Sequence, residues 1–148
     1  MIDESTIPAW AGAESRPRAA LLAPGTKEQQ PGSELLDTIH AQLDVVYQGT
    51  GLEEVEVLDQ VDLLVVLGGD GSILRAAQQM GARQRPVIGI NLGRLGFLAA
   101  ISPGEVESAL ASVVSGQCSI TSHLMLNCSL IRGGEVLIEQ LGLNEAAI

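Results

Sequence analysis

The chain has 148 residues, of which 46% are hydrophobic and 18% charged, a composition that excludes intrinsic disorder for most of its length. Its 18 acidic and 8 basic residues give a net charge of -10, which argues against a nucleic-acid-binding face and against attraction to an anionic membrane. Lys27 is the only lysine, so no G-x-x-x-x-G-K-[ST] motif is present and the chain is not a P-loop NTPase.

The first part of the chain predicts one strand and one helix. Residues 1–17 mix polar and small side chains with two prolines, and we expect a flexible leader there that adds little to the core. The apolar run 18–23 ends at Pro24, which is typical of a first buried strand. Apolar residues recur at helical spacing over 33–43, and this spacing predicts a helix with Ser33 as its N-cap.

The middle of the chain contains the clearest strand. A short strand is expected at 45–47 and a turn at 49–51, whereas the alternating residues 53–58 fit no single element. The aliphatic run 63–67 is continuous, as expected for a strand that is covered on both faces in a parallel sheet.

The alternation of strands and helices continues after a glycine-rich segment. Residues 73–80 predict a helix that ends at Gly81. Residues 86–90 predict a further buried strand, and 91–98 a loop punctuated by glycines.

The last predicted helix has a strong start signal. Residues 102–105 combine an N-cap serine, a proline at the first helical position and a glutamate that completes a capping box, and the helix is expected to reach Gly116. Together, these elements predict an α/β domain over 18–117, with an open, mostly parallel sheet and flanking helices.

The pattern changes after residue 117. Apolar side chains alternate over 120–130, a pair of glycines at 133–134 is a hairpin-turn signal, and 135–148 is expected to return as the partner strand. We expect 118–148 to begin an antiparallel all-β domain that is incomplete here, so that the chain is the front part of a longer protein.

The expected hairpin would expose unpaired edges and an apolar face. We place Leu124, Leu126 and Leu130 on that face. Such a surface favours self-association.

The sequence predicts a cytoplasmic protein without a membrane segment. Cys118 and Cys128 are expected to be reduced thiols rather than a disulfide or a metal pair, which suits a reducing compartment. The N-terminus is acidic and lacks an apolar h-region, and the longest apolar run is far shorter than a membrane span.

A glycine-rich candidate site follows the clearest strand, where open α/β sheets bind ligands at the carboxyl ends of their strands. Gly68, Gly69, Gly71 and Ser72 would form a loop whose backbone amides favour phosphate. Asp70 inside this loop has two open interpretations. In the first, its carboxylate accepts a proton from a hydroxyl nucleophile or positions that hydroxyl. In the second, Asp70 simply caps the helix expected to begin near Ser72.

Four further residues leave alternatives open. Arg75 either approaches a phosphate or is a solvated surface charge. Phe97, in the loop 91–97, either lines a ligand pocket or belongs to the core. Asn144 and Glu145 interrupt an apolar strand, and they either face solvent or bind sugar hydroxyls.

No metal site is predicted from the histidines. His40 and His123 have no cysteine or histidine partners at metal-ligand spacing, so structural roles are expected for both.

Three segments together resemble the ATP-NAD kinase family. Residues 67–77, LGGDGSILRAA, are similar to its GGDG[TS]-x-L-R-A segment. Residues 86–99, PVIGINLGRLGFLA, match its N-L-G-x-L-G-F-L block almost completely, and 143–148, LNEAAI, resemble its L-N-[DE] segment. Phosphofructokinases and diacylglycerol or sphingosine kinases share a GGDG-like motif, so the second block is the one that identifies the family. The resemblance spans roughly residues 18–148.

This resemblance implies an NAD kinase, which transfers the γ-phosphoryl group of ATP, or of polyphosphate in some members, to the 2′-hydroxyl of the adenosine ribose of NAD. The product is NADP, and a divalent metal such as Mg²⁺ assists. The resemblance also implies a homo-oligomer, dimer or tetramer, in which an all-β second domain completes the NAD site.

By motif position, the resemblance implies that Asp70 is the proton acceptor. The residues that it places around NAD are Asp70, Gly71, Arg75, Phe97, Asn144 and Glu145. Two positions depart from the family pattern: Ser72 replaces the commoner threonine, and His123 stands where an E-R-x-x-L stretch usually has its arginine.

Two other functions stay open beside this one. The chain could be a nucleotide-binding fragment without catalysis, or a GGDG-motif kinase that acts on a lipid or a sugar. We expect the chain by itself to have negligible kinase activity, because one domain supplies only one wall of a site between two domains.

Overall fold

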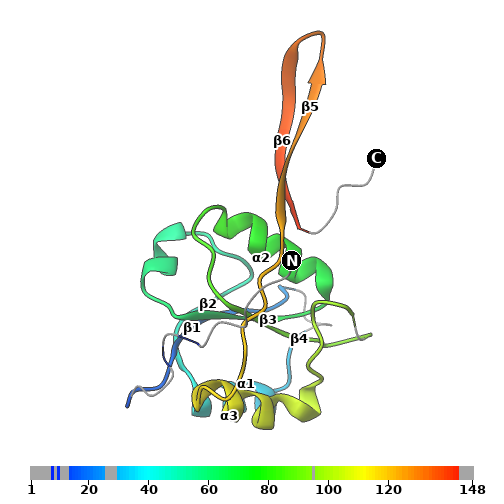
Figure 1. Ribbon diagram of the computed structural model, residues 1–148. Helices are drawn as coiled ribbons and strands as arrows, with labels where there is room; N and C mark the ends of the chain where they lie inside the picture. Colours follow the sequence, from blue (N-terminus) through cyan, green and yellow to red (C-terminus); the bar gives the residue numbers. More distant parts are fainter. Residues whose placement is uncertain (1–7, 9, 11–13, 26–29, 95, 144–148) are drawn as a thin grey trace.

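The computed structural model describes residues 8, 10, 14–25, 30–94 and 96–143. They form a layered α/β domain and a long antiparallel hairpin that projects away from it (Figure 1).

The sheet of the α/β domain has four parallel strands in the order β2-β1-β3-β4. The strands are β1 (Arg18–Leu22), β2 (Asp44–Gly49), β3 (Leu63–Leu67) and β4 (Val87–Ile90). Every residue of β3 is buried, as expected for an aliphatic strand in the middle of a covered sheet. The predicted parallel sheet is therefore confirmed, and β2 extends beyond the predicted 45–47 at both ends.

The strand order creates a topological switch between β1 and β3. From β1 the chain moves outward to β2, and it then crosses back to β3 and continues to β4 on the opposite side. Ligands of open α/β sheets bind at such a point, outside the carboxyl ends of the strands. A ligand site is therefore expected at the loops after β1, β3 and β4.

Helices cover both faces of the sheet (Figure 1). They are α1 (Ser33–Gln42), α2 (Asp70–Met80) and α3 (Val106–Val114). Because strand residues alternate between faces, Leu64 and Val66 of β3 pack in the cluster beside α2. Leu63, Val65 and Leu67 pack in the cluster beside α1 and α3. The flanking helices of the predicted fold are thus confirmed.

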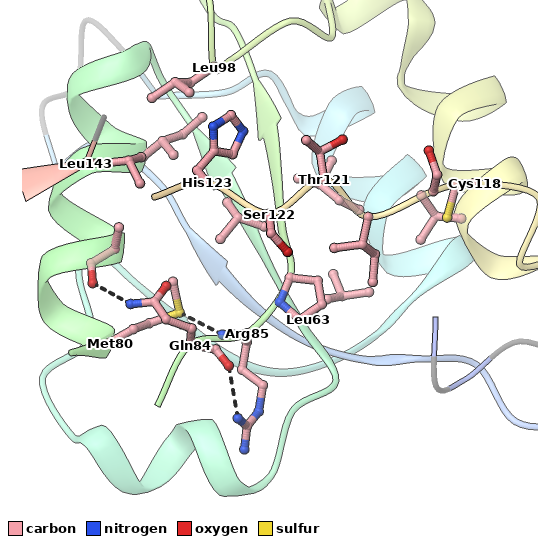
Figure 2. Close-up of a pocket in the computed structure, with 18 of the residues that line it drawn as sticks. Leu63, Met80, Gln84, Arg85, Leu98, Cys118, Thr121, Ser122, His123 and Leu143 are labelled. Carbon is pink, nitrogen blue, oxygen red and sulfur yellow. Dashed lines mark hydrogen bonds between the residues drawn. The ribbon is translucent and has the colours of Figure 1, made fainter. Parts of the chain in front are cut away.

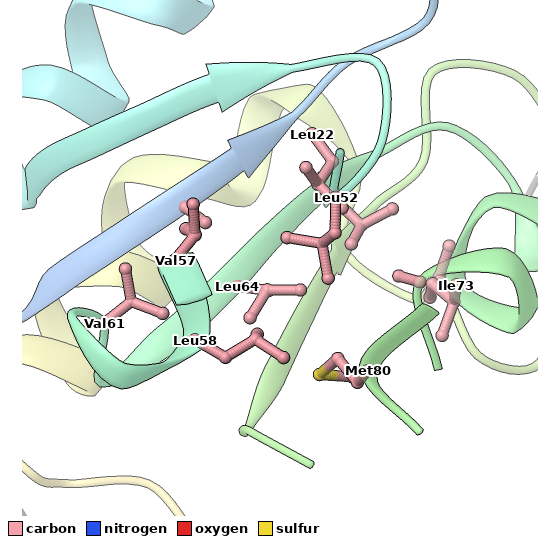
Figure 3. Close-up of a cluster of buried hydrophobic side chains, with 12 residues drawn as sticks. Leu22, Leu52, Val57, Leu58, Val61, Leu64, Ile73 and Met80 are labelled. Atoms are coloured by element: carbon pink, nitrogen blue, oxygen red, sulfur yellow. The ribbon is translucent and has the colours of Figure 1, made fainter. Parts of the chain in front are cut away.

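The segment 53–58, which fits no element by its pattern, contains a short helix. This helix, η2 (Val55–Asp59), turns Val57 and Leu58 into the core beside Leu64 and Met80 (Figure 3). Burying a leucine of this kind is worth about 1.5–3 kcal/mol, so η2 helps to seal the α2 side of the sheet.

Trp10 corrects the expectation that residues 1–17 add little to the core. Its side chain is only 8% exposed, and its indole N–H donates a hydrogen bond of 2.8 Å to the carbonyl of Val113 in α3. Arg16 also donates to the carbonyls of His40 and Ala41 at the end of α1, at 3.0 Å each. Contacts between such distant residues leave no periodic pattern in the sequence.

The helix ends follow most of the predicted signals. Gly32 and not Ser33 is the N-cap of α1, so the prediction for Ser33 is wrong by one residue. Gly81 ends α2 with a φ of 56°, a conformation that glycine adopts without strain. The capping box of Ser102 and Glu105 is confirmed, and it opens a short turn, η3 (Pro103–Glu105), that leads into α3.

The predicted hairpin is also confirmed. β5 (Met125–Arg132) and β6 (Glu135–Leu143) pair antiparallel. Gly133 and Gly134 make the turn with φ values of 62° and 85°, as a two-residue hairpin turn requires. At its base, Gln78 of α2 donates a hydrogen bond of 2.9 Å to the carbonyl of Leu141, and this contact ties the hairpin to the α/β domain.

Candidate functional site

A cleft of about 670 Å³ opens at the carboxyl ends of the central strands. It is lined by the loops that follow β1, β3 and β4, by Thr50 after β2, and by the start of α2. The cleft therefore lies at the topological switch, where this type of sheet binds ligands. Of the predicted phosphate-loop residues, Gly68, Gly69, Gly71 and Ser72 all line it.

The glycine turn brings the chain sharply from β3 into α2. Gly68 has a φ of 148°, and a side chain there would collide with the Ser72 hydroxyl. The amide of Gly68 donates to the carbonyl of Ile90 at 2.9 Å, which fixes the turn against β4. The helix begins at Asp70, slightly before the predicted start near Ser72, so Gly71 and Ser72 belong to its first turn. Free amides of a first turn favour anions.

Asp70 does not cap its helix. The N-cap of α2 is Gly69, and no side chain caps the helix there. Instead, the Asp70 carboxylate accepts three backbone hydrogen bonds from the loop after β4. Oδ2 accepts from the amide of Phe97 at 2.9 Å, and Oδ1 accepts from the amides of Leu98 at 3.0 Å and Ala99 at 2.9 Å. The helix-cap interpretation is therefore wrong.

These hydrogen bonds set the charge state of Asp70. The amide of Ala99, followed by that of Phe97, lowers the pKa of the carboxyl below its ordinary value. Partial desolvation opposes this effect, and the amide of Leu98 adds to it. Hydrogen bonds to the ionised form stabilise it, so Asp70 is a carboxylate at neutral pH and a weak base.

The close approach of Asp70 to its loop depends on Gly96. A Cβ at position 96 would collide with the carboxylate group of Asp70. The glycine before Phe97 is thus required for the contact, a role that its place in a turn-forming loop does not by itself reveal.

Asn91 organises the same loop from inside. It is only 3% exposed, and its Nδ2 donates to the carbonyls of Arg94 and of Ala99, the latter at 3.2 Å. Its Oδ1 accepts from the amide of Gly93 at 2.8 Å. Asn91 is not among the site residues predicted from the sequence. An asparagine placed directly after a buried strand, at the head of a glycine-rich loop, was the available signal.

The two candidate side chains outside the turn are both exposed. Arg75 lines the cleft. Phe97 is 101% exposed, so its assignment to the core is wrong, and it is not among the residues that line the cleft. Its backbone amide binds the Asp70 carboxylate, while its side chain is in solvent. Asn144 and Glu145 lie outside the described residues.

A second cavity, of about 570 Å³, lies between α2, the β4 edge and the segment 118–125 (Figure 2). It is mostly apolar, and His123 is among its lining residues. The Arg85 guanidinium is held at its rim by the carbonyls of Val61 and Gln84. Burial raises the pKa of the Cys118 thiol, and both cysteines are free.

Two further properties concern the described residues alone. Among them, no group of three or more histidine, cysteine, aspartate or glutamate side chains could hold a metal ion. None of the helices within the described ranges is long and apolar enough to cross a membrane.

Comparison with known proteins gives a consistent result. A family model for the ATP-NAD kinase N-terminal domain matches residues 25–118. An NAD kinase from Rhodopirellula baltica is 57% identical over 89 residues, which are 60% of this chain and 29% of that protein. An NAD kinase from Geobacter sulfurreducens is 43% identical over 101 residues, 68% of this chain and 35% of that protein. The chain thus spans about a third of the length of these curated relatives.

Two solved structures share the fold. A yeast NADH kinase in complex with NADH has a TM-score of 0.57 and 18% identity, over 88% of this chain and 47% of that chain. An NAD kinase from Archaeoglobus fulgidus in complex with ATP has a TM-score of 0.58 and 23% identity, over 80% of this chain and 45% of that chain.

Proposed function

The chain belongs to the ATP-NAD kinase family, and from that premise we propose that it supplies the phosphate-loop side of an NAD kinase active site. The reaction transfers the γ-phosphoryl group of ATP to the 2′-hydroxyl of the adenosine ribose of NAD, giving NADP and ADP. One observation carries this proposal. The Asp70 carboxylate joins the glycine turn after β3 to the loop after β4, so the two motifs of the chain meet at one carboxylate.

Asp70 acts as the group that orients the hydroxyl and receives its proton. A carboxylate has about four acceptor positions, and three of them are used by backbone amides. The remaining position, on Oδ2, is open to a hydroxyl donor. In the transfer, the 2′-oxygen forms a bond to the γ-phosphorus, the bond from that phosphorus to the β–γ bridging oxygen breaks, and the hydroxyl proton passes to Asp70 and then to solvent.

The lowered pKa of Asp70 favours orientation over early deprotonation. General base catalysis is most effective when the pKa lies near the working pH, whereas Asp70 lies well below it. Phosphoryl transfer has a loose transition state that needs little help from a strong base and much from positioning. A fixed, ionised carboxylate suits that requirement.

The donor phosphates lie at the glycine turn. The backbone of Gly68, Gly69 and Gly71 faces the cleft, and the first turn of α2 adds its free amides. Mg²⁺ keeps several waters and is commonly held by substrate phosphates with one or two carboxylates. With Oδ2 of Asp70 assigned to the ribose hydroxyl, such a metal would be held by the donor phosphates and water, and it would neutralise charge on the transferring group.

The NAD side of the site is formed by Gly71 and Phe97, with Asn144 and Glu145 holding the adenosine ribose, whereas Arg75 lines the cleft of the glycine turn and approaches a phosphate. The ring of Phe97 is fully exposed, on a residue whose amide binds Asp70, and a base or ribose would cover it. The protein works as a cytoplasmic homo-oligomer. The relatives and the solved structures reported above are NAD or NADH kinases, and they lend no support to a lipid or sugar kinase.

The test is NADP formation from NAD and ATP, followed with an NADP-specific dehydrogenase. It is run on the chain itself and on a chimera in which residues 18–118 replace the matching part of the Rhodopirellula baltica NAD kinase. We expect the chimera to be active and the chain alone to be much slower, because Phe97 is fully exposed and Asp70 only half-buried, so that the chain alone does not exclude water. A folded chimera that forms no NADP would contradict the proposal.

A further inference from the structure

The cleft at the carboxyl ends of β1, β3 and β4 differs in charge from the rest of the chain. The protein has 18 acidic and 8 basic residues. The described residues that line the cleft nevertheless include Arg75 and Arg94 and not one aspartate or glutamate. In a chain of net charge -10, a cleft of this composition is suited to an anion.

The charges of these two arginines are not neutralised by the described part of the protein. The ion pairs found there join Asp59 to Arg83 and to Arg85. Both Arg75 and Arg94 are exposed. Each guanidinium therefore keeps its five N–H donors for water or for a ligand. Two of these donors can bind two oxygens of one phosphate group at the same time.

Both arginines are also mounted on fixed backbone. Arg75 is in the second turn of α2. The carbonyl of Arg94 accepts a hydrogen bond from the buried amide group of Asn91, which also binds the backbone of Gly93 and Ala99. The loop thus holds the backbone of Arg94 in place while its side chain lines the cleft. Such preorganisation reduces the entropy lost on binding.

We propose that Arg94 is a phosphate-binding residue that holds, together with Arg75, the β- and γ-phosphates of the phosphoryl donor. This inference rests on the proposed function and adds a residue and a ligand chemistry to it. The recognised group is a linear chain of phosphates, from ATP or from inorganic polyphosphate. Asp70 is not among the lining residues, and its charge is held by the amides of residues 97–99, so the cleft keeps its positive character.

Calorimetry in magnesium-free buffer tests this role. It measures the binding of sodium tripolyphosphate, of ATP and of adenosine to the 148-residue chain. Arg94→Gln is expected to lower the affinity for tripolyphosphate and for ATP about tenfold or more, since losing a charge-assisted hydrogen bond changes affinity by that order. Arg94→Lys should fall between Arg94→Gln and the parent chain. Arg83→Gln removes the same charge outside the cleft and is expected to stay within about twofold.

Several results would overturn the assignment. The first is that the parent chain does not bind tripolyphosphate, and the second is that Arg83→Gln and Arg94→Gln lower the affinity equally. The third is that Arg94→Gln lowers the affinity for ATP alone, which would place Arg94 on the nucleoside. The assignment is supported if Arg94→Gln loses affinity for both tripolyphosphate and ATP while its binding of adenosine is unchanged. If phosphate binding depends on Arg94 while the chimera forms no NADP, the assignment of Arg94 stands and the NAD kinase function fails.

Discussion

The amide of Ala99 donates a hydrogen bond of 2.9 Å to the carboxylate of Asp70, which lies 29 residues earlier in the chain. Because Asp70 begins α2 and Ala99 lies beyond β4, this bond joins the loops of two neighbouring strands. The same carboxylate is the proposed acceptor for the ribose hydroxyl. It therefore has a structural and a chemical role, and substitutions can separate the two.

Asp70→Asn keeps the shape of the side chain and removes its charge. In the active chimera we expect turnover to fall by about 10²–10⁴-fold, the usual contribution of a proton acceptor, with little change in the KM for NAD. The coupled NADP assay measures both. Asp37→Asn, on the exposed surface of α1, is the matched control and should leave turnover unchanged. A fall of less than about tenfold for Asp70→Asn would contradict its catalytic role.

Gly96→Ala leaves the carboxylate intact but displaces it, because the added Cβ collides with Asp70. We expect a loss of turnover close to that of Asp70→Asn while the far-ultraviolet circular dichroism stays that of the parent. Gly93→Ala is the matched control in the same loop, since its Cβ would meet only Asn91 Oδ1 at 3.9 Å, an ordinary contact. Equal activities of the two alanine variants would show that the position of Asp70 does not matter.

Acid should destabilise the fold through two carboxyl groups. Hydrogen bonds lower the pKa of Asp70, chiefly that from Ala99, and the pKa of Glu105, chiefly that from the Ser102 hydroxyl. A pKa lowered by folding stabilises the protein fully above the unfolded value of about 4, and this stabilisation is lost as pH falls through the folded value. We expect Asp70→Asn to unfold at a lower temperature than the parent at pH 7, and the difference to shrink below about pH 4. A difference that stays constant down to pH 2.5 would exclude this linkage.

Local patterns predicted most of the fold but not the contacts of the site. β3 and the hairpin follow from apolar runs and turn residues within a few positions of one another. The partners of Asp70 lie 27 to 29 residues away, and the partner of Trp10 lies 103 residues away. Which distant groups meet depends on strand order and on loop packing, and neither is encoded in local periodicity.

Asn91→Ala should destabilise the chain, because it leaves the amide of Gly93, the carbonyl of Arg94 and the carbonyl of the buried Ala99 without their partner. Unsatisfied buried polar groups cost about 1–3 kcal/mol, and urea unfolding measures this loss directly. Asn127→Ala is the control, since its hydrogen bond to Glu139 is on an exposed face of the hairpin. The control should change the free energy of unfolding by no more than about 0.5 kcal/mol. Equal losses would show that Asn91 does not organise its loop.

Exposed apolar pairs lie on both faces of the hairpin. Leu130 of β5 lies opposite Ile138 of β6, and the two side chains are 50% and 56% exposed. On the other face, Ile131 lies opposite Val136, and these side chains are 61% and 58% exposed. Leu126 is on the same face as Leu130, as predicted, but Leu124 precedes the strand and is 69% exposed.

Because an isolated two-stranded sheet cannot bury these side chains, we expect the 148-residue chain to associate through the hairpin at tens of micromolar, an order of magnitude typical of exposed apolar strands. Light scattering measures the mass. Replacing Leu130 and Ile138 together by serine should shift the chain toward the monomer, because it removes the apolar pair while keeping the backbone ladder. Asn127→Ser removes no apolar side chain and should leave the association unchanged. A stable monomer of the parent chain at these concentrations would show that the exposed pair does not drive contact between copies, and an unaltered mass in the double variant would place the contact elsewhere on the surface.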